Sequence, residues 1–323
     1  MIAAPPTVGI VSTTKNAHHL HDWIAYHKKM GVDYIALYFD DAEPDQQNIK
    51  IANRYDGVTS IIGYRAGDAP TLTTKQLSNV LDGLNYLKGK GCDWVFHIDD
   101  DELIYVKPDA TIGEAIARLK GINDCHGLIC RNYESLRTLP GVEDYNYFRA
   151  EKWFVTQAML AYPNGKSAAN IRFEGQLSAR GVHRFRFDNG PTKQCQQNDI
   201  VILHYPFHIF SRFYEKCKDG GVAHNSPFAL YKLIGAAIGD SVNEHLPARL
   251  YQTTVVSSEN RIENLRRRGK VVELDVMGKA EATSRRLPGA GTRVEASQHD
   301  GNDYHAHIET RNIALVQHDP QPG

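Results

Sequence analysis

The chain has 323 residues, enough for one large α/β domain or two small ones. Hydrophobic residues make up 41%, charged residues 23% and the net charge is −1, which is typical of a globular protein and excludes a strongly basic nucleic-acid binder. No stretch approaches the about 18 apolar residues of a membrane span, and the first residues do not resemble a signal peptide. The five cysteines form no C-x-x-C pair, so we expect a reduced, cytoplasmic setting, with peripheral membrane association left open.

Strand-like and helix-like patterns alternate along the first half of the chain. The predicted strands are 8–13, 34–39, 58–64, 94–98 and 127–130, and the predicted helices are 19–30, 75–88 and 111–120. Such alternation predicts an α/β fold with a mainly parallel sheet that helices cover on both faces. In sheets of this kind, ligands bind at the carboxyl ends of the strands.

The second half is less regular. Residues 132–198 are rich in Arg, Asn and Gly, and we interpret them as loops and hairpins on the acceptor side. A strand over 199–205 is followed by a helix that ends near Lys218, and a further helix is predicted over 227–239. Large apolar side chains are few after residue 282, so a domain over 1–282 and a disordered tail over 283–323 are expected.

Four acidic residues, Asp99-Asp100-Asp101-Glu102, follow the predicted strand 94–98 without a gap. Carboxylates gathered at a strand end repel one another unless a cation neutralises them, and oxygen ligands suit Mg²⁺ or Mn²⁺. Because side chains alternate along a strand, Asp99 and Asp101 are expected on one side, as the two metal ligands of a D-x-D pair, with Asp99 also beside the donor. A solvated acidic turn is the alternative interpretation.

Several segments together carry a resemblance that none carries alone. In chain order they are Lys15-Asn16, W-I-A-Y-H at 23–27, G-V-D-Y at 31–34, Asp40-Asp41, Gln76, residues 94–102, His204-Tyr205 and residues 211–220. This order resembles the motifs of glycosyltransferase family 2-like proteins, including their D-x-D-E motif and their late H-Y element. The resemblance covers roughly residues 7–221. Ala17 and Leu103 depart from the pattern, which usually has Glu and Phe at these places.

The resemblance implies a GT-A fold, a nucleotide-sugar donor and a divalent metal, Mn²⁺ or Mg²⁺. It divides the domain into a nucleotide-sugar-binding half over 7–131, an acceptor and metal half over 132–221, and a helical extension over 222–282. It also implies that four residues contact the donor, namely Lys15, Asn16, Asp40 and Gln76.

The end of the strand before residue 205 holds a further candidate ligand. His204 matches the family's H-Y element and is expected to complete the metal site, since an imidazole is a reasonable companion to two carboxylates. If His204 is a core histidine instead, His208 or His183 takes its place. Lys216 lies one turn into the following helix and is expected to reach a donor phosphate, although a surface lysine would fit the same pattern.

Transfer with inversion needs a general base that deprotonates the acceptor hydroxyl. Glu143 and Asp144 are the preferred candidates, because they follow the metal motif in the irregular acceptor region. The competing carboxylates are Glu134, Glu151 and Glu174. The histidine run at 18–21 has no acid at metal-site spacing and is expected only to start a helix.

These observations favour an inverting, metal-dependent glycosyltransferase of the hexosyltransferase class. Its expected donor is a nucleotide-diphosphate sugar and its acceptor a saccharide or glycolipid, as in polysaccharide biosynthesis. One alternative is a metal-dependent phosphotransferase or nucleotidyltransferase that uses the same acids. The other is a carbohydrate-binding relative that binds the donor without turnover.

Overall fold

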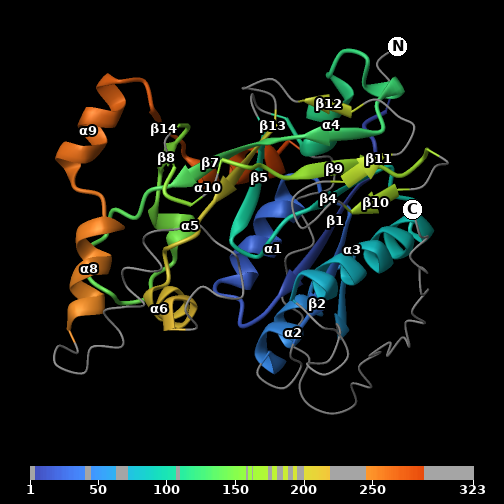
Figure 1. Ribbon diagram of the computed structural model, residues 1–323. Helices are drawn as coiled ribbons and strands as arrows, with labels where there is room; N and C mark the ends of the chain where they lie inside the picture. The colour runs from blue at the N-terminus through green and yellow to red at the C-terminus, as the bar shows by residue number, and fades with distance from the viewer. Residues whose placement is uncertain are drawn as a thin grey trace, which may run out of the picture.

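A computed structural model shows the chain as a mixed α/β structure with two sheets and helices packed around them (Figure 1). Within the part of the chain that it describes, no helix is both long and apolar enough to cross a membrane. The described residues are 4–40, 45–62, 72–106, 110–157, 159–161, 163–173, 177–179, 185–187, 192–194, 200–218 and 245–286.

The first sheet has the strand order β12-β6-β9-β4-β1-β2-β3. It is mainly parallel, as expected, and β9 is the strand that runs antiparallel to both of its neighbours. Its strands are β1 (Val8–Thr14), β2 (Tyr34–Phe39), β3 (Val58–Ile62), β4 (Trp94–His97), β6 (Gly127–Ile129), β9 (Ser167–Asn170) and β12 (Thr192–Gln194).

Helices cover both faces of this sheet. On one face α3 (Leu72–Gly89) contacts β1, β2 and β4, and on the other α1 (Leu20–Lys29) packs into the main core. Side chains alternate between the two faces along β1, so Val11 packs with α3 while Ile10 packs under α1. Sequence periodicity therefore predicted these layers correctly.

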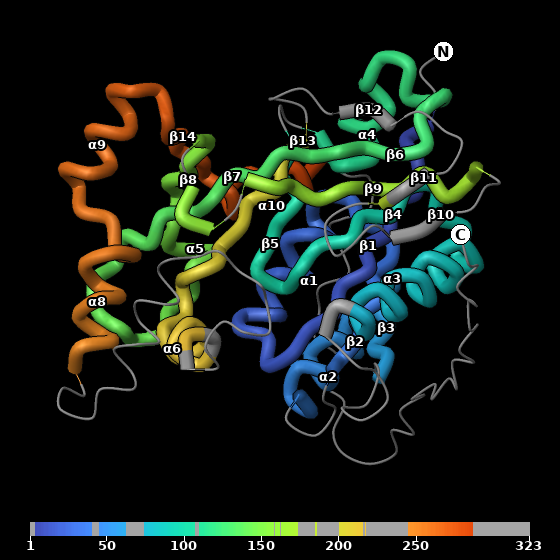
Figure 2. Tube along the Cα trace, in the orientation of Figure 1, coloured from blue at the N-terminus to red at the C-terminus, as the bar shows by residue number. Residues whose placement is uncertain are grey.

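A second sheet, which the sequence did not predict, has the order β14-β8-β7-β13-β5. Its strands are β5 (Glu102–Val106), β7 (Arg131–Ser135), β8 (Trp153–Val155), β13 (Ile200–His204) and β14 (Val271–Glu273). The chain enters the second sheet from the first at several places, among them from β4 through residues 98–101 into β5 and from β6 through Cys130 into β7 (Figure 2). The acidic segment is thus one of these crossings.

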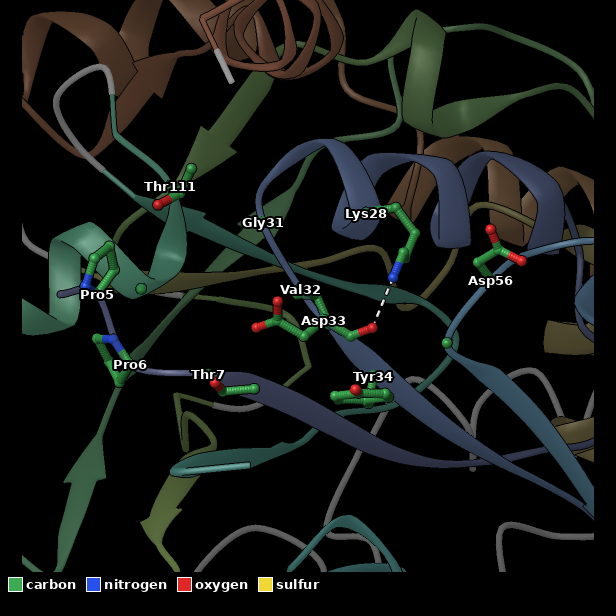
Figure 3. A pocket seen from close by; sticks show the side chains of 12 residues that line it. Pro5, Pro6, Thr7, Lys28, Gly31, Val32, Asp33, Tyr34, Asp56 and Thr111 are labelled. Atoms are coloured by element: carbon green, nitrogen blue, oxygen red, sulfur yellow. Dashed lines mark hydrogen bonds between the residues drawn. The ribbon is translucent and has the colours of Figure 1, made fainter. Parts of the chain in front are cut away.

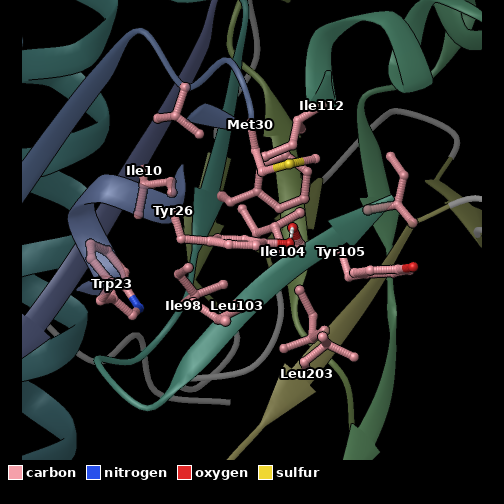
Figure 4. Packing of buried hydrophobic residues seen from close by; sticks show 14 of the residues in the cluster. Ile10, Trp23, Tyr26, Met30, Ile98, Leu103, Ile104, Tyr105, Ile112 and Leu203 are labelled. Carbon is pink, nitrogen blue, oxygen red and sulfur yellow. Dashed lines mark hydrogen bonds between the residues drawn. The ribbon is translucent and has the colours of Figure 1, made fainter. Parts of the chain in front are cut away.

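The outer edge of β5 is closed by side chains of α1 rather than by another strand. Trp23 Nε1 donates to the Glu102 carbonyl at 2.7 Å, and the Tyr26 hydroxyl donates to the Ile104 carbonyl at 3.1 Å. His27 Nε2 accepts from the Ile104 amide at 3.3 Å, and burial lowers the pKa of His27 to about 3, so that it stays neutral. The rings of Trp23 and Tyr26 also belong to the main core, together with Leu103 and Ile104 of β5 (Figure 4). The W-I-A-Y-H segment therefore satisfies an edge strand that would otherwise expose unpaired backbone groups.

The remaining elements surround the two sheets. They are α2 (Gln46–Ala52), α4 (Ile112–Ala117), η1 (Ile122–Asp124), α5 (Tyr147–Ala150), the hairpin of β10 (Leu177–Ala179) and β11 (Phe185–Phe187), α6 (Phe210–Lys218), α8 (Leu246–Thr254), α9 (Glu259–Arg267) and α10 (Val276–Ser284). In Figures 1 and 2, α8 and α9 lie beside the second sheet, away from β1 to β3.

Residues 245–286 form the helices α8, α9 and α10 and one strand, β14, which pairs with β8. The helix expected over 227–239 lies outside the described residues, as do residues 287–323 of the expected tail. α10 continues to Ser284 and Thr283 is buried, so ordered structure reaches slightly beyond the predicted start of the tail.

The first prediction concerns the closed edge of β5. Trp23→Phe should lower the free energy of unfolding by about 2–4 kcal/mol, because it leaves the buried Glu102 carbonyl without its donor and opens a small cavity. Leu81→Ala, at a position 40% exposed on α3, should cost less than about 1 kcal/mol. Urea unfolding of both variants measures the difference, and equal losses would contradict the proposed role of the indole N–H.

Candidate functional site

The polar residues singled out from the sequence gather at the carboxyl ends of the strands of the first sheet. Lys15 and Asn16 follow β1, Asp40 follows β2, and the acidic turn follows β4. β1 pairs in parallel with both β2 and β4, so these ends share one edge. His204 reaches the same turn from the second sheet, because it pairs with Glu102 at the start of β5.

Asp99 is held by a buried lysine. The side chain of Lys166, just before β9, is 1% exposed, and its Nζ donates to Asp99 Oδ2 at 2.6 Å. The same Nζ lies 3.4 Å from Glu102 Oε2, which also accepts from the Asp99 amide at 2.9 Å. Burial raises the pKa of Glu102 to about 8, although Lys166 opposes the shift. Burial lowers the pKa of Lys166, but Asp99 and Glu102 outweigh it and raise that pKa above its usual value.

Asp100 pairs with a different cation, Arg212. Arg212 of α6 donates from Nη2 to Asp100 Oδ1 at 3.0 Å, and the Thr14 hydroxyl donates to Oδ2 at 2.6 Å. Asp100 is buried, whereas the Arg212 side chain remains 29% exposed. The charge of Asp100 raises the pKa of Arg212, so the guanidinium stays protonated. The sequence interpretation missed Arg212, although it lies in the late segment that carries the family resemblance.

Asp101 and His204 face each other across the crossing. Asp101 Oδ1 lies 3.8 Å from His204 Nε2, and both residues are buried. The backbone fixes this approach, since the Asp101 carbonyl accepts from the Tyr205 amide at 2.9 Å. On the other side of the ring, Asn132 Nδ2 lies 3.4 Å from His204 Nδ1.

The expected metal ligands are brought near one another but not into a group of three. Among the described residues, no cluster of three or more His, Cys, Asp and Glu side chains could hold a metal ion. Asp101 and His204 form a pair, while Asp99 is held by Lys166. Two protein ligands suit Mg²⁺ or Mn²⁺, which commonly take their other ligands from water and from substrate phosphates. The metal roles of Asp99, Asp101 and His204 remain predictions.

The loop between β7 and α5 brings a further carboxylate to this edge. Asp144 is exposed, and the carbonyl of the next residue, Tyr145, lies 2.9 Å from Nε2 of His19, shortly after β1. Burial and the charge of Arg212 lower the pKa of the neighbouring His18. Burial raises the pKa of the Tyr147 hydroxyl, and the nearby aspartates add to that shift. His18 precedes α1, as the helix-start interpretation expected, but it also belongs to the site.

The other candidates for the general base bond to groups of the protein. Glu143 is exposed, but its carboxylate folds back against Gly141. Glu134 accepts from the amides of Leu160 and Ala161 at 2.8 and 2.7 Å. Glu151 accepts from the Thr138 amide and hydroxyl at 2.7 and 2.8 Å. Both of these buried carboxylates therefore support backbone, and Glu174 lies outside the described residues.

The donor-side candidates lie on the same rim. Asp40 Oδ1 is 3.3 Å from Lys75 Nζ of α3, and Gln76 follows Lys75 on that helix. Lys15 and Asn16 are exposed, and the Asn16 amide donates to the Asp45 carboxylate at 3.0 Å from a backbone with φ of 51°. The contacts of these four candidates with a donor stay predictions.

The alternative histidines differ in their surroundings. His208 is buried among aromatic rings, with ring centroids 5.3 Å from Tyr147 and 5.4 Å from Tyr205, and burial lowers its pKa to about 3. These contacts are those of a core histidine. His183 and the side chain of Lys216 lie outside the described residues.

A cavity of about 580 Å³ lies at the opposite edge of the sheet, near the amino ends of β1 and β2 (Figure 3). Lys28, Asp33 and Asp56 line it, and Lys28 Nζ donates to the Asp33 carbonyl at 2.7 Å. None of the site residues predicted from the sequence lines this cavity.

Comparison with known proteins finds glycosyltransferase-like relatives. No family model matches the chain. One glycosyltransferase-like protein of Arabidopsis thaliana is 23% identical over 244 residues, 62% of this chain and 53% of the relative. A second from the same organism is 22% identical over 246 residues, 62% of this chain and 47% of the relative. The chain thus spans about half the length of the curated relatives it matches.

Solved structures give weaker matches. A 4-diphosphocytidyl-2C-methyl-D-erythritol synthase from Anaerococcus prevotii is 15% identical, with 52% of this chain and 71% of that chain covered and a TM-score of 0.28. HddC from Yersinia pseudotuberculosis is 11% identical, with 66% and 99% covered and a TM-score of 0.33. Scores this low carry no argument about function. The sequence relatives therefore support a glycosyltransferase-like protein without a finer class.

The second prediction tests the buried charges of the acidic turn. Lys166→Met should lower the free energy of unfolding by about 3–5 kcal/mol at about pH 9, because it leaves the buried Glu102 and the half-buried Asp99 without their cation. Without Lys166 the folded-state pKa of Glu102 rises further above its wild-type value of about 8, so the loss should grow as pH rises through about 8 and be smaller at about pH 6. Urea unfolding at both values measures it.

A surface ion pair offers a matched control. Lys29 pairs with Glu281, and their side chains are 29% and 53% exposed. Lys29→Met should cost no more than about 1 kcal/mol at either pH, since water screens an exposed pair. A Lys166→Met loss as small as that of Lys29→Met, or one that shrinks as pH rises, would contradict the electrostatic role of Lys166.

Proposed function

We propose that this protein is a metal-dependent glycosyltransferase with a GT-A type arrangement, which moves a sugar from a nucleotide-diphosphate donor to a saccharide or glycolipid acceptor. The observation that carries the proposal is the meeting of the β1, β2 and β4 ends and the acidic turn at one edge, which the loop that carries Asp144 reaches through the contact of Tyr145 with His19. The glycosyltransferase-like relatives support the same class.

In this proposal Asp101 and His204 bind a Mn²⁺ or Mg²⁺ ion together with the donor diphosphate. When bound, the ion neutralises the charge that develops on the leaving diphosphate. Lys166 fixes Asp99 beside the donor, and Arg212 offers its remaining N–H groups to phosphate oxygens from the partly exposed side of Asp100. Lys216, one turn further along α6, is a second phosphate contact of the proposal.

The tautomer of His204 decides how it takes part. With the Asn132 amide nitrogen toward Nδ1, that ring nitrogen accepts, and Nε2 carries the proton toward Asp101. Metal binding at Nε2 requires the Asn132 amide to turn, so that its oxygen accepts from Nδ1–H. The amide nitrogen and oxygen of Asn132 have nearly the same size, so either orientation fits, and the hydrogen bonds decide between them.

The donor nucleoside fits the other end of the rim. We assign Asp40, whose position Lys75 fixes, to the ribose or base, and Lys15, Asn16 and Gln76 to neighbouring donor contacts. This assignment follows the family resemblance, and it places the nucleoside above the ends of β1 and β2.

Asp144 is the proposed general base. It is exposed and precedes Tyr145, whose carbonyl contacts His19 near the end of β1, whereas the Glu143 carboxylate lies against Gly141 of its own loop. A carboxylate in this position accepts the proton of the acceptor hydroxyl as its oxygen attacks the anomeric carbon from the face opposite the diphosphate. The reaction then inverts the anomeric centre.

The products of turnover test the class of reaction. The purified chain is incubated with a panel of nucleotide-diphosphate sugars, Mn²⁺ and saccharide acceptors, and the released nucleotide is identified by chromatography. A glycosyltransferase releases a nucleoside diphosphate, whereas a nucleotidyltransferase releases pyrophosphate from a nucleoside triphosphate. Donor binding without either product would favour a carbohydrate-binding relative.

The third prediction concerns the acidic turn. Asp101→Ala should lower transfer by at least about 100-fold while the protein stays folded, because it removes one of the two proposed metal ligands, Asp101 and His204. Chelation should silence the wild type, and added Mn²⁺ or Mg²⁺ should restore it. Asp124→Ala, at an exposed aspartate of η1, is the control and should behave as wild type. Retained transfer in Asp101→Ala would refute the metal assignment.

The fourth prediction concerns His204. His204→Ala should weaken Mn²⁺-dependent binding of a nucleoside diphosphate by about 10- to 100-fold, as expected when a ligand or its support is lost. Calorimetry with and without Mn²⁺ measures the effect, and binding without the ion should change little. If the variant binds like wild type in both conditions, His204 is structural.

A further inference from the structure

Arg137 is a buried arginine whose whole hydrogen-bonding capacity goes to its surroundings. Its side chain lies at the end of β7 and is 1% exposed. Nε donates to the Leu139 carbonyl at 3.2 Å, and Nη2 donates to the carbonyls of Gly141 and Glu143 at 3.0 and 3.2 Å. Nη1 donates to the His208 carbonyl and to the Tyr251 hydroxyl. All five N–H groups of the guanidinium are thus used, three of them on a single loop.

The same loop is held from its other side by Glu151. This buried carboxylate accepts from the amide and hydroxyl of Thr138 and from the hydroxyl of Tyr145. The Tyr145 ring in turn lies under the Arg137 guanidinium, with 4.7 Å from the guanidinium carbon to the ring centroid. Arg137 therefore bonds the middle of residues 138–145, and Glu151 bonds both of its ends.

The loop carries the proposed base. Nη2 of Arg137 bonds the carbonyl of Glu143, the residue immediately before Asp144. The Asp144 side chain itself is exposed, and the carbonyl of the next residue, Tyr145, lies 2.9 Å from His19 Nε2, close to the end of β1. A bond to the backbone next to an exposed side chain limits where that side chain can point.

Stability alone is a poor reason for this arrangement. A buried guanidinium loses its hydration, and apolar residues of similar volume are often at least as stabilising at such a position. Its planar fork can however satisfy carbonyls in fixed directions, which a lysine or an apolar side chain cannot do. The effect specific to Arg137 is therefore that it holds the loop in one conformation.

We propose that Arg137 is a positioning residue that holds the loop 138–145 so that the Asp144 carboxylate faces the acceptor hydroxyl. The inference rests on the proposed function, because it assumes that Asp144 is the base. Arg137 contacts none of the residues assigned to the donor, so its loss should lower the transfer rate and leave donor binding intact.

The test uses Arg137→Lys and Arg137→Ala in the full chain. Arg137→Lys keeps the charge but loses the fork, and kcat for transfer should fall by about 10- to 100-fold, as misplacement of a catalytic group does. The Kd of a nucleoside diphosphate with Mn²⁺ should stay within about threefold of wild type, because the donor residues lie on other elements. Guanidinium ion added to Arg137→Ala should restore part of the transfer rate. Arg149→Lys, on an arginine of α5 that is 61% exposed, should match wild type.

A double-mutant cycle with Asp144→Asn identifies how Arg137 acts. If it works through the base, Arg137→Lys/Asp144→Asn should transfer no more slowly than Asp144→Asn alone. Multiplicative losses in the cycle, wild-type transfer in Arg137→Lys, or an equal loss of donor binding and transfer would each overturn the proposal. A wild-type protein that binds and turns over no nucleotide sugar would instead overturn the proposed function itself, and the positioning role with it.

Discussion

The structure depends on how it balances the charge of one turn. Residues 99–102 place four carboxyl groups where the chain leaves the first sheet and enters the second. Like charges so close are unfavourable in a buried setting unless cations or protons compensate them. Lys166 compensates Asp99 and Glu102, and Arg212 compensates Asp100. Since Lys166 precedes β9 and Arg212 belongs to α6, the turn also fixes where these two elements pack.

One segment of the family resemblance, W-I-A-Y-H at 23–27, has a structural role at this crossing. Trp23, Tyr26 and His27 bind backbone groups of β5, on the edge where no strand pairs with it among the described residues. One of these groups is the Glu102 carbonyl, so α1 holds the end of the acidic turn. The segment thus acts on the site indirectly, by supporting the strand that follows the carboxylates.

Local patterns predicted the first sheet well, because its strands and helices are long enough to show their periodicity. β2 was expected over 34–39 and is observed there. The second sheet was missed, since β8 and β14 have three residues each and pair across the chain. The residues of the site were likewise predicted only in part. Strand ends pointed to Asp99, Asp101 and His204, but Lys166 and Arg212 lie 67 and 112 residues from their partners, beyond the reach of any local pattern.

The charges at this edge also bear on why a divalent ion belongs in the proposed reaction. Burial raises the pKa of Glu102, which favours its neutral form relative to an exposed carboxyl group. Asp99 and Asp100 face the cations Lys166 and Arg212, whereas Asp101 faces the imidazole of His204. A diphosphate that approached this edge would be repelled, most of all by Asp101, whose facing partner His204 is a titratable imidazole and not a permanent cation. A divalent cation beside Asp101 reverses the sign of that interaction. In the proposed reaction, the carboxylates of this turn are therefore the reason to expect that donor binding depends on the metal.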